Sequence, residues 1–205
     1  MKMLNVSLWL AFVSVALTAS DYQIKTVNVL PLESYPARKE LAGVTVAADP
    51  YSTDEKSFTA FDVKRLNSRG YFPVHVIIQN STSKFLSIKT RNIVLVTSSG
   101  QKFYTTPATL VVDDVIKSGL LLKTPKKPKT KNSGSPLSDF TNKELANRLR
   151  DPSTVSDGFL FFFTPNPQTN PFAGSSLYIP QIEEEGTKNQ LGPFLIPLDA
   201  YESNK

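Results

Sequence analysis

Short segments of alternating side chains, separated by turn residues, constrain the fold of this chain more than any other feature. In the clearest of them, 71–80 (YFPVHVIIQN), Val74, Val76 and Ile78 point one way and the intervening residues point the other. A second segment, 158–164 (GFLFFFT), is apolar on both faces, as in a central strand covered on both sides. Many short strands joined by turns predict a mainly β fold, specifically an antiparallel β-sandwich.

Turn and capping residues extend this prediction along the chain. The sequence Ser98-Ser99-Gly100 predicts a hairpin. Two or three short helices are expected, from the capping pairs Ser52/Glu55 and Thr141/Glu144 and from Thr106-Pro107 before a helically spaced apolar run. Further strands are predicted at 41–48, 85–88, 93–97, 102–104, 176–182 and 191–198, with an edge strand or extended lead-in at 21–38.

The N-terminus has the pattern of a secretory signal peptide. Lys2 precedes an apolar stretch of sixteen residues, 4–19, and small residues follow before Asp21. A comfortable membrane span needs about twenty apolar residues. We therefore predict a cleaved signal peptide at 1–20, a single β-sandwich domain at 21–205, and no integral membrane span after cleavage. The chain has no cysteine, which excludes disulfides, thiolate metal sites and a lipid-modified N-terminal cysteine.

The net charge of +5 comes from one stretch of the sequence. Five lysines lie within 123–131, and without them 18 basic and 18 acidic residues remain. Segment 123–138 has no apolar periodicity and is rich in Lys, Pro, Ser and Gly, which predicts a long flexible basic loop inserted in the domain. Its candidate binding residues for an anionic surface are Lys126, Lys127, Lys129 and Lys131. No aromatic or arginine side chains are interleaved with them, so nucleic acid is not an expected partner.

Three stretches carry a resemblance to a known group of proteins. They are 47–63 (AADPYSTDEKSFTAFDV), 70–88 (GYFPVHVIIQNSTSKFLSI) and 93–108 (IVLVTSSGQKFYTTPA). Together with the GFLFFF and SLYIP segments, they resemble uncharacterised exported bacterial proteins with an immunoglobulin-like β-sandwich. The resemblance implies that fold and a location in the cell envelope, and it implies no defined activity.

Candidate catalytic groups are few. His75 is the only histidine and is expected to be a solvent-facing or half-buried strand residue. Asp113 and Asp114 are adjacent on a predicted helix and should diverge. The run Glu183-Glu184-Glu185 could contribute to a calcium site, although the alternating acidic loop typical of such sites is missing. No phosphate-binding glycine loop is present, and no cofactor is expected.

Two hypotheses for function follow. The first is an exported, non-catalytic cell-envelope protein, in the periplasm or at the cell surface, that acts as a structural or protein-interaction module. Its expected partner is another envelope protein, contacted through sheet edges, the basic loop, or Phe172 presented outward from the proline-rich loop 165–174. The alternative is an exported hydrolase or calcium-dependent binding protein that uses the acidic residues.

Overall fold

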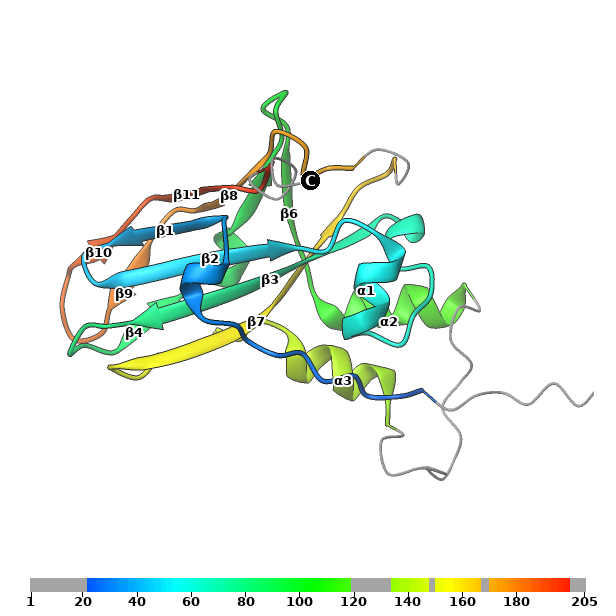
Figure 1. The fold of residues 1–205 in the computed structure, drawn as a ribbon, viewed down its shortest axis with the longest axis horizontal. Helices are drawn as coiled ribbons and strands as arrows, with labels where there is room; N and C mark the ends of the chain where they lie inside the picture. Colours follow the sequence, from blue (N-terminus) through cyan, green and yellow to red (C-terminus); the bar gives the residue numbers. More distant parts are fainter. Residues whose placement is uncertain (1–21, 119–133, 148–149, 167–169, 200–205) are drawn as a thin grey trace, which may run out of the picture.

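The computed structural model describes residues 22–118, 134–147, 150–166 and 170–199 (Figure 1). The predicted signal peptide and the four candidate lysines of the basic loop lie outside these residues. The helices are α1 Asp54–Ala60, α2 Ala108–Lys117 and α3 Pro136–Lys143, with 3-10 turns at Leu32–Ser34, Asn67–Arg69 and Thr90–Asn92. The strands are β1 Arg38–Leu41, β2 Val44–Pro50, β3 Tyr71–Asn80, β4 Leu86–Ile88, β5 Val94–Val96, β6 Lys102–Thr106, β7 Thr154–Phe163, β8 Ser176–Ile179, β9 Ile182–Glu184, β10 Gln190–Leu191 and β11 Phe194–Pro197.

Eight of these strands form one antiparallel sheet that curls into a nearly closed barrel. Its strand order is β1-β2-β3-β7-β6-β5-β8-β11, and the two outer strands, β1 and β11, lie against each other. The predicted β-sandwich, immunoglobulin-like or otherwise, is therefore wrong. The long strand β7 pairs with β3 along its whole length, and its last residues also pair with Thr105 and Thr106 of β6. Because β7 pairs with both β3 and β6, one hydrogen-bonded sheet runs through all eight strands, whereas a β-sandwich would have two separate sheets.

The barrel interior holds the main hydrophobic core. Alternate residues of the strands point into it, and Val74, Val76 and Ile78 of β3 are buried there as the alternation predicted. Leu160 and Phe162 of the neighbouring strand β7 join them. Burying each such side chain contributes about 1.5–3 kcal/mol, so this alternation is a major source of the free energy of folding.

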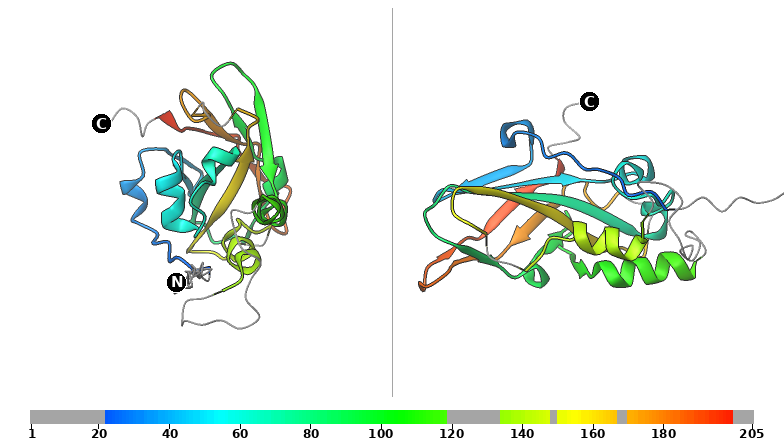
Figure 2. Two further views of the ribbon diagram at one scale, coloured as in Figure 1. Left: turned by 90° about the vertical axis from the view of Figure 1, so that its right-hand side faces the viewer. Right: turned by 90° about the horizontal axis from the view of Figure 1, so that it is seen from below.

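The outer face of β3 and β7 is covered by helices. Phe159 and Phe161 point outward from β7 and contact Phe61, which follows α1, with ring centroids 4.9 and 5.5 Å apart. Phe140 of α3 stacks on Phe161 in the same cluster. The prediction that segment 158–164 is covered on both sides is thereby confirmed. The three helices gather at one end of the barrel (Figures 1 and 2).

Several element boundaries differ from those predicted. The predicted strand 41–48 is confirmed from Val44 onward, as part of β2, but its start is wrong: Ala42 and Gly43 both have positive φ and turn the chain between β1 and β2. Helix α1 is capped by the Thr53 side chain and not by Ser52. Helix α2 begins at Ala108, so Pro107 is its N-cap residue and not its first helical residue.

The second predicted capping pair, Thr141/Glu144, was also wrong. Helix α3 begins at Pro136, inside the end of the predicted basic loop, and Glu144 is its C-cap. Proline suits the first turn of a helix because its missing N–H would have no partner there.

The C-terminal part has four strands where two were predicted. The chain bends near Pro180 and Pro193, which interrupt the predicted segments 176–182 and 191–198. Strands β8 and β11 pair with each other in the barrel sheet, whereas β9 pairs with β10 and β4 in a small three-stranded sheet. This small sheet lies at the end of the barrel opposite the helices (Figure 1).

Candidate functional site

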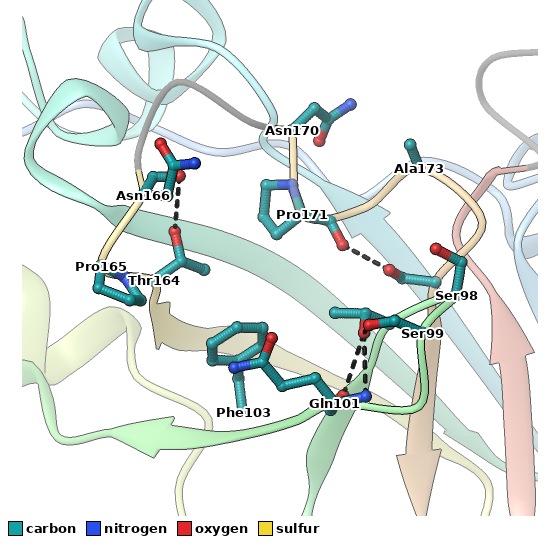
Figure 3. A pocket seen from close by; sticks show the side chains of 12 residues that line it. Ser98, Ser99, Gln101, Phe103, Thr164, Pro165, Asn166, Asn170, Pro171 and Ala173 are labelled. Atoms are coloured by element: carbon teal, nitrogen blue, oxygen red, sulfur yellow. Dashed lines mark hydrogen bonds between the residues drawn. The ribbon is translucent and has the colours of Figure 1, made fainter.

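A pocket with a volume of about 360 Å³ opens at one end of the barrel, which we call the mouth (Figure 3). Two loops form it: the β5–β6 hairpin loop and the described part of the segment between β7 and β8. These four strands are neighbours in the antiparallel sheet, so both loops leave it at the same end. Barrel mouths are common places for ligand sites, and typical ligand pockets have volumes of about 300–1,000 Å³.

The hairpin loop is held in place by its own hydroxyl groups. The backbone N–H of Gln101 donates to Thr97 Oγ1 at 3.1 Å, and the hydroxyls of Thr97 and Ser99 are 2.9 Å apart. Gly100 has a φ of 80°, a conformation that glycine adopts without strain. This local geometry places the Gln101 side chain at the pocket, beside Phe103 of β6 (Figure 3).

The facing loop is anchored by Phe172. Its side chain is only 2% exposed and packs edge-on against Phe72 of β3, with ring centroids 5.9 Å apart. Asn170 Oδ1 accepts a hydrogen bond from the Phe172 backbone N–H at 3.0 Å, and the Ser175 hydroxyl donates to the Pro171 carbonyl. The expectation that Phe172 points outward to a partner is therefore wrong: the ring fixes the loop to the core and leaves neighbouring residues to line the pocket.

Among the residues that the structure describes, those that line the pocket are all uncharged. They are Thr97, Ser98, Ser99, Gln101, Phe103, Thr164, Pro165, Asn166, Asn170, Pro171, Ala173 and Ser175. Amides and hydroxyls can both donate and accept hydrogen bonds, and Phe103 and the prolines supply apolar contact. A charged ligand would lose hydration here without meeting an opposite charge, so the lining favours an uncharged ligand. The described part of the lining includes no histidine, carboxylate or amine that could act as a general acid or base.

His75 is far more buried than expected. It is 1% exposed, its ring stacks on Phe159 with centroids 4.6 Å apart, and Nε2 lies 2.7 Å from Asp157 Oδ2. The expectation of a solvent-facing or half-buried histidine was wrong because the outer face of β3 is covered by other parts of the chain. His75 does not line the pocket.

The acidic candidates lie on different elements and have separate partners. On α2, Asp113 pairs with Lys117 at 2.6 Å and Asp114 pairs with Arg69 at 3.3 Å, so the two carboxylates diverge as predicted. In the small sheet, Glu183 lies 2.7 Å from Lys89, and hydrogen bonds from Lys89 and Gln181 lower the pKa of its carboxyl. Within the described ranges, no group of three or more His, Asp or Glu side chains could hold a metal ion.

Sequence reasoning missed the pocket but recognised both of its loops. The Ser98-Ser99-Gly100 turn and the proline-rich segment 165–174 were each identified as loops, and the hairpin is confirmed. Neither contains a motif that signals a binding site. The nearest signal is the concentration of Ser, Thr, Asn and Pro in both loops, which is also the ordinary composition of turns.

The fold and the pocket together define a class: a nearly closed antiparallel barrel with an uncharged pocket at its mouth. No protein-family model matches the chain, and the search of curated proteins gave no match. Among solved structures, a candidate lipoprotein of Bacillus subtilis is 15% identical with a TM-score of 0.41, and the alignment covers 78% of this chain and 38% of that one. A protein of unknown function from Listeria monocytogenes is 11% identical with a TM-score of 0.34, covering 77% of this chain and 80% of that one.

Likenesses this distant carry no argument about the function of this chain, and they do not support an immunoglobulin-like fold. The chain spans little more than a third of the length of the Bacillus protein. In the described part of the chain, no helix combines the length and the hydropathy that a membrane span requires.

Proposed function

We propose that this chain is an exported, non-catalytic cell-envelope protein, located in the periplasm or at the cell surface, that binds an uncharged segment of an envelope partner at the barrel mouth. The observation that carries the proposal is the uncharged lining of the pocket. It offers amide and hydroxyl hydrogen bonds beside an aromatic ring, which suits binding. The signal-peptide pattern at 1–20 supports export.

The hydrolase alternative has no comparable support. His75 is buried beside Asp157, and the acidic candidates on α2 and β9 face lysine or arginine partners. None of these side chains lines the pocket. A reacting group and its general base should lie within hydrogen-bond reach in one cleft. The three glutamates line a hollow at the β9–β10 turn, but His75, Asp113 and Asp114 do not line it.

Photo-crosslinking in intact cells tests the binding proposal. A photoreactive amino acid replaces Gln101 at the pocket, and in a control variant it replaces Lys188, an exposed residue of the β9–β10 turn. We expect a discrete crosslinked species from position 101 only, because only that position faces the pocket. Free monomer alone, or equal crosslinking from both positions, would contradict the proposal.

Mass determination of the chain recovered from the cell envelope tests export separately. We expect a mature chain that starts close to residue 21. Recovery of the chain with Met1 and an intact N-terminal segment from the cytoplasm would contradict export. A failure of export and a failure of pocket binding are therefore distinguishable.

A further inference from the structure

Strand register places four apolar side chains in one row across the outside of the barrel. Val94 of β5 pairs with Tyr104 of β6 on one side and with Tyr178 of β8 on the other, and Tyr178 pairs with Leu195 of β11. Directly paired residues point to the same face of a sheet. We call Tyr104, Val94, Tyr178 and Leu195 the outer tyrosine row.

The neighbouring row confirms which way these side chains point. One position further along the strands, Leu95 pairs with Phe103 and with Leu177, and Leu177 pairs with Ile196. These four side chains belong to the interior core or pack against it. Because successive residues of a strand alternate between faces, the outer tyrosine row faces away from the barrel interior.

Three side chains of the outer tyrosine row reach the surface, whereas Val94, between the two tyrosines, is 5% exposed and lies beneath them. Tyr104 is 65% exposed and Leu195 is 53% exposed, with Tyr178 half-buried between them. On the other side of the barrel, most outward apolar residues of β3 and β7 pack under the helices or against Leu32 and Tyr35, although Val155 and Phe163 at the two ends of β7 are exposed. The helices lie at one end of the barrel, away from β8 and β11 (Figure 1). Exposed apolar side chains that gather on one face of a protein often mark interaction sites.

The dimensions of the row indicate what kind of partner fits. Four adjacent strands span about 14 Å, and the row is one residue wide along the strands. A stable contact with a folded partner or a second copy buries about 800 Å² on each side, far more than this row offers. A single extended chain lying across the strands matches a site of this shape.

The spacing of the tyrosines selects the conformation of that chain. Tyr104 and Tyr178 lie two strands apart, or about 9.6 Å between their backbones. A polyproline II segment advances about 3.1 Å per residue, so residues three apart lie about 9.3 Å apart on the same side. In a β-strand, side chains on one face repeat about every 6.7 Å, which does not match. Domains that recognise proline-rich segments line their binding surfaces with aromatic side chains.

Hydrogen bonding and charge further restrict the chemistry of the partner segment. A polyproline II backbone makes no internal hydrogen bonds, so its carbonyls can accept from the tyrosine hydroxyls. The adjacent outward row contains Lys102, Val96, Ser176 and Pro197, so the only charge in the two rows is positive. This charge disfavours a basic segment, including the chain's own Pro125–Pro128 stretch with its lysines. We propose that the outer tyrosine row binds a non-basic proline-rich segment of a partner protein in the polyproline II conformation.

Titration of a ten-residue polyproline peptide into the mature chain tests this proposal by fluorescence anisotropy. We expect saturable binding that weakens about tenfold or more in each of the variants Tyr104→Ala and Tyr178→Ala, as for aromatic residues at the centre of an interface. The matched control is Phe85→Ala, an aromatic residue of similar exposure outside the row. It should leave peptide affinity unchanged. Circular dichroism of each variant shows whether its fold is intact.

Four results would overturn the proposal. The first is that the polyproline peptide does not bind the unmodified mature chain. The second is that Phe85→Ala loses as much affinity as the two tyrosine variants. The third is that a neutral oligosaccharide such as chitohexaose, and not the peptide, binds at Tyr104 and Tyr178. The fourth is tighter binding of a peptide with the sequence of residues 123–131, which would assign the row to the chain's own basic loop.

Discussion

At the scale of single residues, Asn80 shows how one buried amide can hold two distant parts of the chain together. Its side-chain nitrogen donates to the carbonyls of Lys84 at 2.7 Å, Asp151 at 3.0 Å and Arg150 at 3.3 Å. Its oxygen accepts from the backbone N–H and the hydroxyl of Thr82. The amide therefore joins the turn after β3 to the segment before β7.

We expect Asn80→Ala to lower the free energy of unfolding by about 2–3 kcal/mol, because the Thr82 N–H and the partly buried carbonyls of Lys84 and Asp151 would lose their hydrogen bonds to the Asn80 side chain. Urea denaturation followed by circular dichroism measures the change. Asn142→Ala is the matched control, since that exposed amide makes a single hydrogen bond to Ser138, and it should change stability by less than about 0.5 kcal/mol. Equal effects in the two variants would contradict this role for Asn80.

At the scale of elements, Gly158 allows the chain after α3 to cross strand β7. Leu145 N donates to the Phe159 carbonyl at 2.9 Å, and Glu144 forms a parallel bridge with Phe159. A Cβ at position 158 would lie 2.6 Å from Leu145 Cα and 2.7 Å from Leu145 N. The close approach of these two backbones requires a residue with no side chain at this point of the strand.

We expect Gly158→Ala to destabilise the protein by about 1–3 kcal/mol, since backbone atoms cannot move aside without disturbing β7 or α3. The control is Gly134→Ala, where the added Cβ would meet only the side chain of Ile24, which is 43% exposed and can rotate away. Thermal denaturation of the unmodified chain, Gly158→Ala and Gly134→Ala gives the three melting temperatures to compare. A melting temperature for Gly158→Ala equal to that of the unmodified chain would show that the crossing tolerates a side chain.

At the scale of the whole molecule, four tyrosines make the stability of the folded chain depend on pH in the alkaline range. Burial raises the pKa of Tyr22, Tyr35, Tyr51 and Tyr71 above the ordinary value of 10.0. The hydrogen bond from the Tyr22 hydroxyl to Asp139 adds to the effect of burial on Tyr22. Above pH 10, the unfolded chain loses tyrosine protons that the folded chain retains. The contribution of these tyrosines to the free energy of unfolding is therefore fully present below about pH 10, and it is lost as the pH rises further.

We expect the free energy of unfolding to decrease steeply between pH 9.5 and 11, and to decrease less steeply in Tyr22→Phe, which has one such group fewer. Urea denaturation at a series of pH values gives both slopes. Phe85→Ala, which changes an exposed aromatic residue without removing a titratable group, should keep the slope of the unmodified chain. A slope that is the same in Tyr22→Phe would contradict the coupling at that residue.

The parts of the fold that depend on local pattern were predictable. The bounds of β3, the hairpin at 98–100 and the two covered faces of β7 follow from side-chain alternation and turn residues, which act over a few positions. The errors at Thr141 and at Ala42-Gly43 concern where an element starts or turns. In both places neighbouring residues allow more than one start or turn, and packing against the rest of the chain selects one of them.

Long-range contacts decided the remaining features. His75 and Asp157 are 82 positions apart, and Phe172 is buried because it meets Phe72 from a distant strand. The candidate site depends on two loops that the pairing of β5, β6, β7 and β8 brings together. Neither loop, taken alone, signals a pocket.

By itself, the sequence determined that the chain is mainly β, which side chains of its long strands point together, and where several of its turns fall. These properties follow from the preferences of adjacent residues. Only the tertiary structure decided that the strands close into a barrel and not a sandwich, that uncharged loops meet at its mouth, and that two tyrosines align on its outer face. A barrel and a sandwich require the same alternation of buried and exposed residues, and they differ only in which distant strands form hydrogen bonds with each other.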